Sequence, residues 1–183
     1  MRVISGTAKG RRLKTPSGHD VRPTSELVKE AVASMIQFEI EGSRVLDIFC
    51  GTGQMGIEFL SRGARSAVFV DSSKDSCAMA LQNISLCGLS DRARVVTSEA
   101  SAFLRSCRQR FDICFLDPPY RVGLLQEILP LVFPLIEDYG TVICESSSDD
   151  KPPLDMGSFS VFRSYRYGKT LITLYRHQNN QED

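Results

Sequence analysis

The residues best placed to do chemistry form the stretch Asp117-Pro118-Pro119-Tyr120, in the second half of the chain. They follow the apolar run "FDICFL" (111–116), whose composition predicts a buried strand. Two consecutive prolines fix two φ angles and offer carbonyl oxygens without N–H groups. We therefore expect a stiff loop that presents only acceptors, the Asp117 carboxylate and the Pro118 carbonyl, with an aromatic ring beside them.

Such a pair of acceptors suits the exocyclic amine of a nucleobase. The lone pair of this nitrogen is delocalised into the ring, so the amine is a poor nucleophile. Acceptors that hold its hydrogens favour a pyramidal nitrogen and stabilise the positive charge that develops during transfer. Tyr120 offers a face for a flipped-out base, and such stacking is worth roughly 1–3 kcal/mol. The competing interpretation is a merely structural turn after a strand.

A second candidate site lies in "VLDIFCGTGQMGIEFL" (45–60), where Gly51, Gly53 and Gly56 form the pattern G-x-G-x-x-G between a predicted strand and helix. Asp71 ends the next predicted strand, where a ribose-binding acid is expected. Together these features predict nucleotide binding. By themselves they would also fit a dinucleotide-dependent dehydrogenase.

Asp47 favours a different ligand, because it ends the strand four positions before Gly51. A carboxylate there would repel a pyrophosphate, which needs bare N–H groups and the positive end of a helix. S-adenosylmethionine has no phosphate; a carboxylate can stabilise its ammonium, directly or through water, and its sulfonium tolerates nearby acids. Gly51 and Gly53 would let the backbone approach it closely. The competing interpretation is an N-cap or turn acid.

Further residues complete the expected cofactor site. Asp71 could accept both ribose hydroxyls, and Glu99 could meet the adenine edge. Glu99 could nearly as well be a capping acid before the helix expected over 100–107. Ser72 and Ala100, which directly follow these two acids, belong to the same expected site. The cysteines contain no C-x-x-C pair, so no metal is expected.

Composition describes an ordinary globular protein of one domain. The chain has 183 residues, of which 42% are hydrophobic and 24% charged. No apolar run approaches the length of a membrane span, and the N-terminal sequence does not suggest a secretory signal. The six cysteines are scattered through apolar patterns. They are typical of core residues in a reducing compartment, so a cytoplasmic location is expected.

Charge is unevenly distributed, although the formal net charge is zero. Residues 1–22 contain six basic side chains against one acid, Asp20, so a basic arm precedes an acidic body. Such an arm suggests an anionic partner such as nucleic acid, and a merely solvated terminus is the alternative. "RVIS" and "RRLKT" could form a hairpin that carries these basic residues.

The order of the expected elements predicts the fold class. A helix is expected around Leu27–Ile36, and from Arg44 onward short β-rich runs alternate with helical patterns. This alternation predicts a doubly wound, mostly parallel α/β sheet covered on both faces. "FSVFRSY" and "TLITLYR" predict an antiparallel C-terminal hairpin around Gly168. The expected helical ranges are 54–62, 74–87, 100–107 and 123–136. We expect a single domain, 1–183, with a basic N-terminal extension and helix (1–38) and a Rossmann-like core (39–183).

The chain resembles the RsmD-like family of class I, Rossmann-like methyltransferases, which methylate N2 of a guanine in bacterial small-subunit (16S) ribosomal RNA. The matching segments cover nearly the whole length and include "RVISGTAKGRRL", "RPTSELVKEA", "VLDIFCGTGQMGIEFLSRGA", "DPPY" and "YGKTLITLY". The core motifs are common to the superfamily, whereas the two N-terminal segments are particular to this family.

The resemblance implies a seven-stranded sheet, S-adenosylmethionine as methyl donor with S-adenosylhomocysteine as product, and residues 117–120 as the catalytic loop. Ribosomal RNA or the small ribosomal subunit would be the partner. Nothing in the sequence demands a dimer, so a monomer is expected, and without a long apolar run no membrane partner is expected. The basic arm and the Arg-Pro-Thr loop would lie near the RNA. The implied substrate contacts are Arg2, Lys9, Arg11, Arg12, Arg22 and Thr24.

Some segments depart from the family pattern, and other functions are to be weighed. "CGTGQMG" stands where Ala-Gly-Ser-Gly-Ala-Leu-Gly is more usual, while "VDSSKDS" and "SEA" leave the contacts of Ser72, Ser73 and Glu99 open.

Asp-Pro-Pro-Tyr also serves DNA adenine-N6 methyltransferases, but few residues remain after it for a region that reads DNA. A related loop that begins with Asn serves glutamine methyltransferases. A non-catalytic RNA-binding assembly protein is the remaining alternative.

Overall fold

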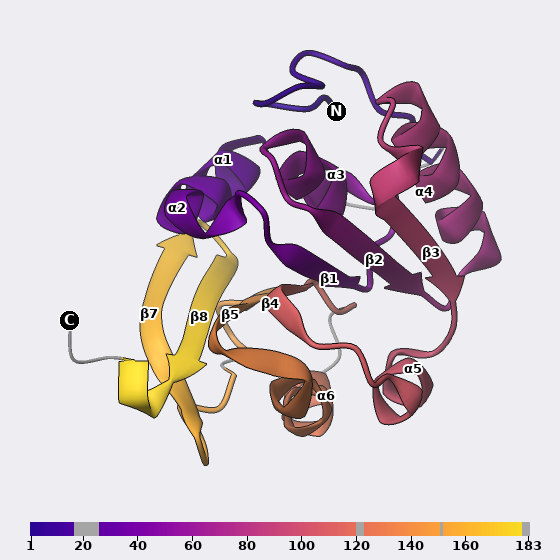
Figure 1. Cartoon of the computed structure of the whole chain (residues 1–183). Helices are drawn as coiled ribbons and strands as arrows, with labels where there is room; N and C mark the ends of the chain where they lie inside the picture. Colours follow the sequence, from indigo (N-terminus) through magenta and orange to yellow (C-terminus); the bar gives the residue numbers. More distant parts are fainter. Residues whose placement is uncertain (17–25, 120–122, 151, 181–183) are drawn as a thin grey trace.

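The computed structural model describes residues 1–16, 26–119, 123–150 and 152–180 of the chain (Figure 1). Three candidate site residues, Arg22, Thr24 and Tyr120, lie outside these ranges, so their roles stay predictions. Within the described ranges, no helix is both long and apolar enough to span a membrane.

An eight-stranded sheet with the order β3-β2-β1-β4-β5-β8-β7-β6 forms the centre of the fold. The first five strands of this order are parallel, and the last three pair antiparallel. The doubly wound sheet and its C-terminal hairpin are confirmed, but the expected seven strands become eight because the two-residue β6 extends the edge. The strands are β1 Arg44–Ile48, β2 Ser66–Asp71, β3 Ala93–Thr97, β4 Phe111–Leu116, β5 Ile136–Ser147, β6 Asp155–Met156, β7 Phe159–Tyr167 and β8 Thr170–His177.

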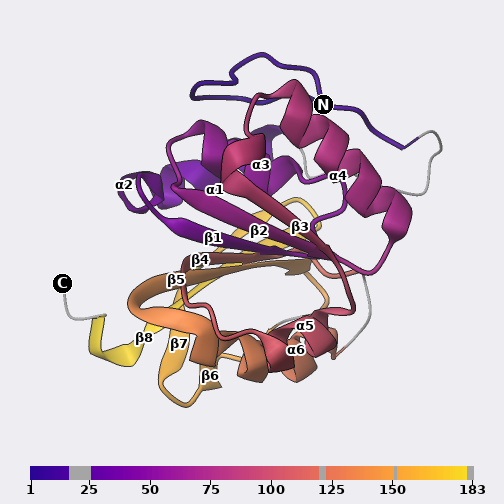
Figure 2. The ribbon, with the colours of Figure 1, turned by 45° about the vertical axis from the view of Figure 1, so that its right-hand side comes forward.

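Helices cover both faces of the sheet, as Figure 2 shows. On one face lie α1 Glu26–Met35, α2 Gln37–Ile40, α3 Gln54–Ser61 and α4 Lys74–Leu86; on the other lie α5 Ala100–Ser106 and α6 Leu124–Val132. Short 3₁₀ turns, η1 Ser90–Arg92, η2 Phe133–Leu135 and η3 Gln178–Asn180, follow α4, α6 and β8. Successive residues of a strand point to opposite faces, so Val45 belongs to the core under α1–α4 and Leu46 to the core under α5 and α6.

The helix expected over 123–136 ends earlier, at Val132. Pro134 lacks an N–H group, and its ring would clash with the carbonyl four residues earlier in a continued helix. The chain instead makes η2 and enters β5 at Ile136, five residues before the expected run "TVICE" begins. The expected helices at 54–62, 74–87 and 100–107 match α3, α4 and α5 to within one residue at each end.

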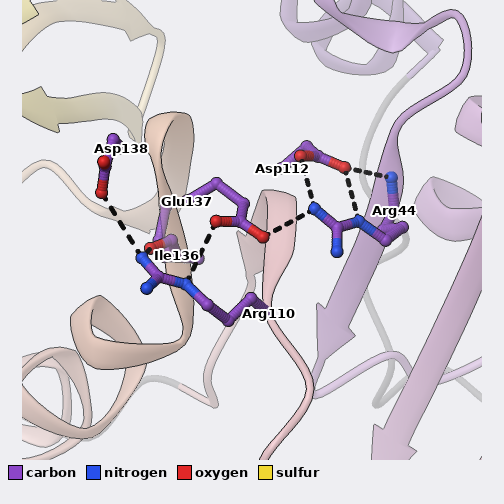
Figure 3. Close-up of polar contacts among 6 residues, drawn as sticks. All are labelled: Arg44, Arg110, Asp112, Ile136, Glu137 and Asp138. Carbon is purple, nitrogen blue, oxygen red and sulfur yellow. Dashed lines mark hydrogen bonds and ion pairs between the residues drawn. The ribbon is translucent and has the colours of Figure 1, made fainter.

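A chain of ion pairs fixes the amino ends of three neighbouring strands (Figure 3). Arg44 donates to both oxygens of Asp112 at 3.0 Å and to Glu137 at 2.8 Å, and Arg110 lies 3.2 Å from Glu137. Burial acts to raise the pKa of Asp112, but its hydrogen bonds from Arg44 outweigh this effect and lower it. These contacts join β1, β4 and β5 at the edge of the sheet away from the cavity described next.

Candidate active site

A cavity of about 1730 Å³ lies at the carboxyl ends of the parallel strands. β1 pairs with β2 on one side and with β4 on the other, so the direction in which the sheet is wound changes between β1 and β4. Ligands of open α/β sheets bind at such a switch point. The loops after β1, β2, β3 and β4 all contribute to the wall, so the cavity brings the predicted glycine loop and the Asp117 loop together.

The glycine loop has the backbone that its sequence pattern predicts. Gly53 is the N-cap of α3 and has a φ of 78°, a conformation that side chains rarely adopt. Gly56 is required for a different reason, because a Cβ there would lie 2.3 Å from Cε1 of Phe69 on β2. The third glycine of the motif therefore lets α3 pack closely on the sheet. Gly51 and Thr52 of this loop line the cavity.

Asp71 supports the glycine loop from the end of β2. Its two carboxylate oxygens accept the N–H groups of Gly51 and Ser73, both at 2.9 Å. Each oxygen keeps a further lone pair, and Asp71 and Ser72 both line the cavity. The geometry thus leaves Asp71 able to accept ribose hydroxyls, which stays a prediction.

Asp47 lies beneath the glycine loop and is only 2% exposed. Its Oδ2 accepts the N–H of Gly56 at 2.9 Å, and the residue is absent from the cavity wall. Burial raises the pKa of Asp47 to about 7; the Gly56 hydrogen bond opposes this, and the charges of Asp117 and Asp71 add to it. Asp47 therefore anchors the first turn of α3. This role is close to that of an N-cap or turn acid, the competing interpretation of the sequence. Any effect on a cofactor ammonium would be exerted from behind the loop.

The raised pKa of Asp47 predicts a pH dependence of stability. Between its ordinary pKa of 3.8 and about 7, the folded protein binds more protons than the unfolded chain. The stabilising contribution is thus complete below the lower value and is lost as the pH rises through the upper one. At about 1.4 kcal/mol per pKa unit, the loss amounts to about 4 kcal/mol.

Asp47→Asn cannot titrate but keeps an oxygen for the Gly56 N–H. We expect it to remove this pH-dependent component from the free energy of unfolding of the unliganded protein, measured in urea from pH 4.5 to 7.5. If the free energy of unfolding changes with pH in the same way for the wild type and the variant, Asp47 is ionised over the whole range from pH 4.5 to 7.5.

Glu99, Ala100 and Ser101 form part of the wall after β3. Glu99 occupies the N-cap position of α5, yet its side chain makes no capping hydrogen bond. Glu99 thus stands at the N-cap position, as the alternative interpretation expected, but its carboxylate does not cap the helix. The exposed carboxylate lies at the cavity, where the proposed contact with an adenine edge would be made.

The loop after β4 faces the cavity, which is lined by Asp117, Pro118 and Pro119. The N–H of Asp117 approaches the carbonyl oxygen of Ile48 at 3.5 Å, so the start of this loop lies beside the end of β1. Asp117 also lies near enough to Asp47 for its charge to raise the pKa of that buried acid. An acceptor-bearing loop and a glycine loop thus share one cavity.

Comparison with known proteins identifies the family. The family described as "Conserved hypothetical protein 95" matches residues 1–176. Ribosomal RNA small subunit methyltransferase D of Escherichia coli (strain K12) is 30% identical, over 100% of this chain and 92% of that protein. The chain belongs to this methyltransferase D family. A provisionally named rRNA methyltransferase of Bacillus subtilis (strain 168), YlbH, is 35% identical over 96% of this chain and 98% of its own length.

Solved structures agree with this assignment. An Escherichia coli protein provisionally described as a methyltransferase, yhhF, has a TM-score of 0.87 and 31% identity, with 97% of each chain covered. A hypothetical protein of Thermus thermophilus has a TM-score of 0.83 and 28% identity, with 96% of this chain and 99% of that chain covered. The family fold therefore extends over the basic arm as well as the sheet.

The basic arm of this family member is bound to α3. The Glu58 carboxylate accepts the N–H groups of Ile4 at 2.8 Å and Ser5 at 3.0 Å, and Ser61 Oγ accepts the N–H of Ala8 at 2.9 Å. Within the arm, the Val3 N–H donates to the Arg11 carbonyl at 3.0 Å. The expected hairpin is thus a short one, with a single bridge between Arg2 and Arg12.

The far end of the arm is joined to the cavity through Asn83 of α4. Its Oδ1 accepts the Lys14 N–H at 2.7 Å, and its Nδ2 donates to the carbonyls of Lys14 at 3.1 Å and Thr52 at 3.0 Å. Thr15, Pro16 and Met1 then line the cavity. The arm therefore forms one wall of the candidate active site.

The candidate RNA contacts of the arm point to solvent. Lys9, Arg11 and Arg12 are exposed. Arg2 pairs with Glu26 at 3.2 Å, but both side chains are exposed, and such pairs contribute little stability. All four cations are thus accessible to an anionic partner.

Sequence reasoning missed several residues of the site. Glu58, Ser61 and Asn83 hold the arm. The sequence offered one signal for this role, because Glu58 is an acid inside the apolar run "GIEFL". Gln54 and Glu145 line the cavity and are 8% and 6% exposed. The turn after β7 also contributes, through Tyr167, Gly168 and Thr170, although its "YGKT" motif had indicated only the family.

Proposed function

We propose that the protein transfers the methyl group of S-adenosylmethionine to the exocyclic N2 amine of a guanine in small-subunit (16S) ribosomal RNA. Membership of the methyltransferase D family supports rRNA methylation. The observation that carries the proposal is the shared cavity, in which the acceptor loop Asp117-Pro118-Pro119 meets the glycine loop and Asp71. The proposal places a monomeric protein in the cytoplasm, with ribosomal RNA or the small subunit as partner.

The charge of the cavity supports S-adenosylmethionine over a dinucleotide. Among the described lining residues, Arg105 is the one basic side chain. The acidic ones are Asp71, Glu99, Asp117, Glu127 and Glu145. Such a wall would repel a pyrophosphate and suits a ligand with an ammonium and a sulfonium. Asp71 and Glu99 would hold the ribose and adenine, with Gly51, Ser72 and Ala100 beside them. Gly53, which does not line the cavity, would shape the loop, and Asp47 would act from behind it.

The chain's own residues would lower the barrier by binding the amine. S-adenosylmethionine would supply an electrophilic methyl group, and the S–CH₃ electron pair would stay with sulfur as the N–CH₃ bond forms. The Asp117 carboxylate and the Pro118 carbonyl would accept the N2 hydrogens and stabilise the positive charge that develops on nitrogen. The carboxylate or solvent then takes one N2 proton. Tyr120, with its ring against the base, would complete this loop.

The test uses cofactor labelled in its methyl group, supplied with small-subunit particles, free 16S rRNA and duplex DNA. We expect nucleoside analysis to locate the label in N2-methylguanosine from the ribosomal substrates. Label on N6 of adenine in DNA would favour the DNA enzyme, and RNA binding without label would favour the assembly protein. S-adenosylmethionine, and not NAD, should raise the melting temperature.

Most of the described chain after the catalytic loop is used by the fold itself. Residues 124–180 form α6, β5 and the three antiparallel strands, with their connections. Little of this described part is left to build a separate region that reads bases in the groove of a DNA duplex. Membership of the methyltransferase D family favours rRNA over DNA as the substrate.

The exposed cations of the arm predict how affinity depends on salt. Arg11→Ala combined with Arg12→Ala should weaken binding to 16S rRNA and reduce the slope of log K against log salt. The expected reduction is about 0.7–0.9 for each phosphate that the arm no longer neutralises. Filter binding from 50 to 300 mM salt measures it.

Arg65 and Arg94 offer a matched control, because they are exposed arginines on the β2–β3 side of the sheet. Replacing both with alanine changes the net charge equally and should leave the slope near that of the wild type. An equal loss of slope in both double variants would mean that net charge, and not the arm, determines affinity.

A further inference from the structure

We propose that Glu145 selects guanine by accepting the N1–H hydrogen of its Watson–Crick edge, beside the amine held by Asp117. This inference rests on the proposed function. Glu145 lies near the carboxyl end of β5, is 6% exposed and lines the cavity. A carboxylate has about four acceptor positions, so Glu145 can accept a hydrogen from a ligand in addition to its other contacts.

Glu145 lies next to Asp117 in the sheet. The β4–β5 ladder ends with the pair Leu116 and Cys144, so Asp117 and Glu145 are the next residues along two adjacent strands. Adjacent strands lie about 4.8 Å apart, and alternate residues share a face. Phe115 belongs to the core under α1–α4, so both acids are expected on that same side of the sheet.

The two acceptors match the two adjacent donors of guanine. In guanine, the ring nitrogen next to the 2-amine carries a hydrogen. In adenine, the ring nitrogen next to the 6-amine is an acceptor, and a carboxylate would repel its lone pair. If Asp117 holds the amine, Glu145 therefore meets a donor in guanine and an acceptor in adenine. This difference would allow the site to select the base by its hydrogen-bond pattern.

Gln54 is a second nearly buried polar side chain that lines the cavity. The residue is 8% exposed, begins α3 and lines the cavity. Its buried Oε1 has no hydrogen-bond partner among the described residues. If the amide is turned over, the buried atom becomes a donor and an amide edge still faces the ligand. The edge of this amide that is not buried offers a second polar contact to a ligand in the cavity.

The test compares guanosine with 2-aminopurine at the target position of an RNA substrate. 2-Aminopurine keeps the 2-amine, but its N1 is an unprotonated acceptor. We expect wild-type enzyme to prefer guanosine by roughly 100-fold in kcat/KM, because a well-placed pair of hydrogen bonds to a base edge discriminates by up to about this factor. Glu145→Gln has nearly the same shape, and its amide can donate to N1 of 2-aminopurine. The variant's preference for guanosine over 2-aminopurine, in kcat/KM, should therefore be smaller than that of the wild type by about 10-fold or more.

The preference of each enzyme is its kcat/KM with guanosine divided by its kcat/KM with 2-aminopurine. Dividing the wild-type preference by that of Glu145→Gln cancels the different reactivities of the two amines and the missing O6, because both enzymes meet the same two bases. Glu127→Gln removes a different acid of the cavity and should keep the wild-type preference. Because Glu145→Gln removes one of the five acids among the described lining residues, its affinity for S-adenosylmethionine should stay within a few-fold of the wild-type value, and its unfolding temperature should stay near that of the wild type. An unchanged preference in Glu145→Gln, or a loss of cofactor affinity that accounts for its lower activity, overturns the inference.

Failure of the inference can be told apart from failure of the proposed function. If wild-type enzyme methylates N2 of guanosine and Glu145→Gln keeps its preference, only the role of Glu145 is wrong. If wild-type enzyme puts no label on N2 of guanosine in any ribosomal substrate, the proposed function is wrong and the inference falls with it.

Discussion

Replacement of Asp117 by alanine is expected to lower the rate of methyl transfer by about 10²–10³-fold while cofactor binding persists. In the proposed mechanism, the Asp117 carboxylate accepts a hydrogen of the amine and stabilises the positive charge that appears on nitrogen only as the new bond forms. Removal of one preorganised group of this kind reduces kcat by such factors in other enzymes. Because Asp117 lies on the loop after β4 and not on the glycine loop, the cofactor site should survive its loss.

The measurement is a single-turnover methylation rate, with cofactor affinity determined by calorimetry on the same preparation. Asp117→Asn serves as the control, because it keeps an acceptor oxygen but loses the charge, so its rate should fall between those of wild type and Asp117→Ala. Near-normal turnover in Asp117→Ala would contradict the acceptor mechanism. An equal loss of cofactor affinity would instead make Asp117 a cofactor residue.

Gly6→Ala should release the basic arm from α3. Gly6 has a φ of 81°, and a Cβ there would lie 1.8 Å from the carbonyl oxygen of Ser61 and 2.2 Å from its carbon. Both are backbone atoms, so the arm or the end of α3 must move. The buried Glu58 would then lose the N–H groups of Ile4 and Ser5. Since breaking the contacts of a buried charge is strongly destabilising, we expect a loss of about 3 kcal/mol or more.

Gly10→Ala is a closely matched control. Gly10 has the same φ, 81°, but a Cβ there has nothing within 4 Å. It should therefore show the backbone strain alone, about 1–2 kcal/mol. Urea unfolding compares the two variants, and filter binding with 16S rRNA should show the larger loss for Gly6→Ala. Equal destabilisation of the two would mean that the contact with Ser61 relaxes easily and that the arm is not tightly held.

Buried contacts hold the arm, which both lines the candidate active site and carries the candidate RNA-binding cations. Lys29 of α1 is buried and its Nζ donates to the Arg2 carbonyl at 2.6 Å. Burial lowers the pKa of Lys29, while Glu58 and Glu26 act against this. Together with Glu58 and Asn83, this contact fixes the backbone that carries the exposed cations. The arm is therefore preorganised, and RNA binding would not have to pay for ordering the described part of it.

Local patterns in the sequence determined the element types and the two loops. The alternation of short apolar runs with helical periodicity predicted β1 to β5 and α3 to α5, because periods of about 2 and 3.6 residues are set within a few neighbours. The prolines after Leu116 and the glycines at 51, 53 and 56 predicted their loops for the same reason. Each depends on the φ angles or the size of single residues.

Tertiary structure decided what those patterns leave open. It buried Asp47 under Gly56 instead of in the cavity wall, bound the arm to Glu58, and brought Gln54 and Glu145 to the site from two separate elements. The register that sets Glu145 beside the Asp117 loop pairs Leu116 with Cys144, which lies 28 positions later in the chain. Contacts over such separations depend on how sheet and helices pack, and periodicity within one segment carries no information about them.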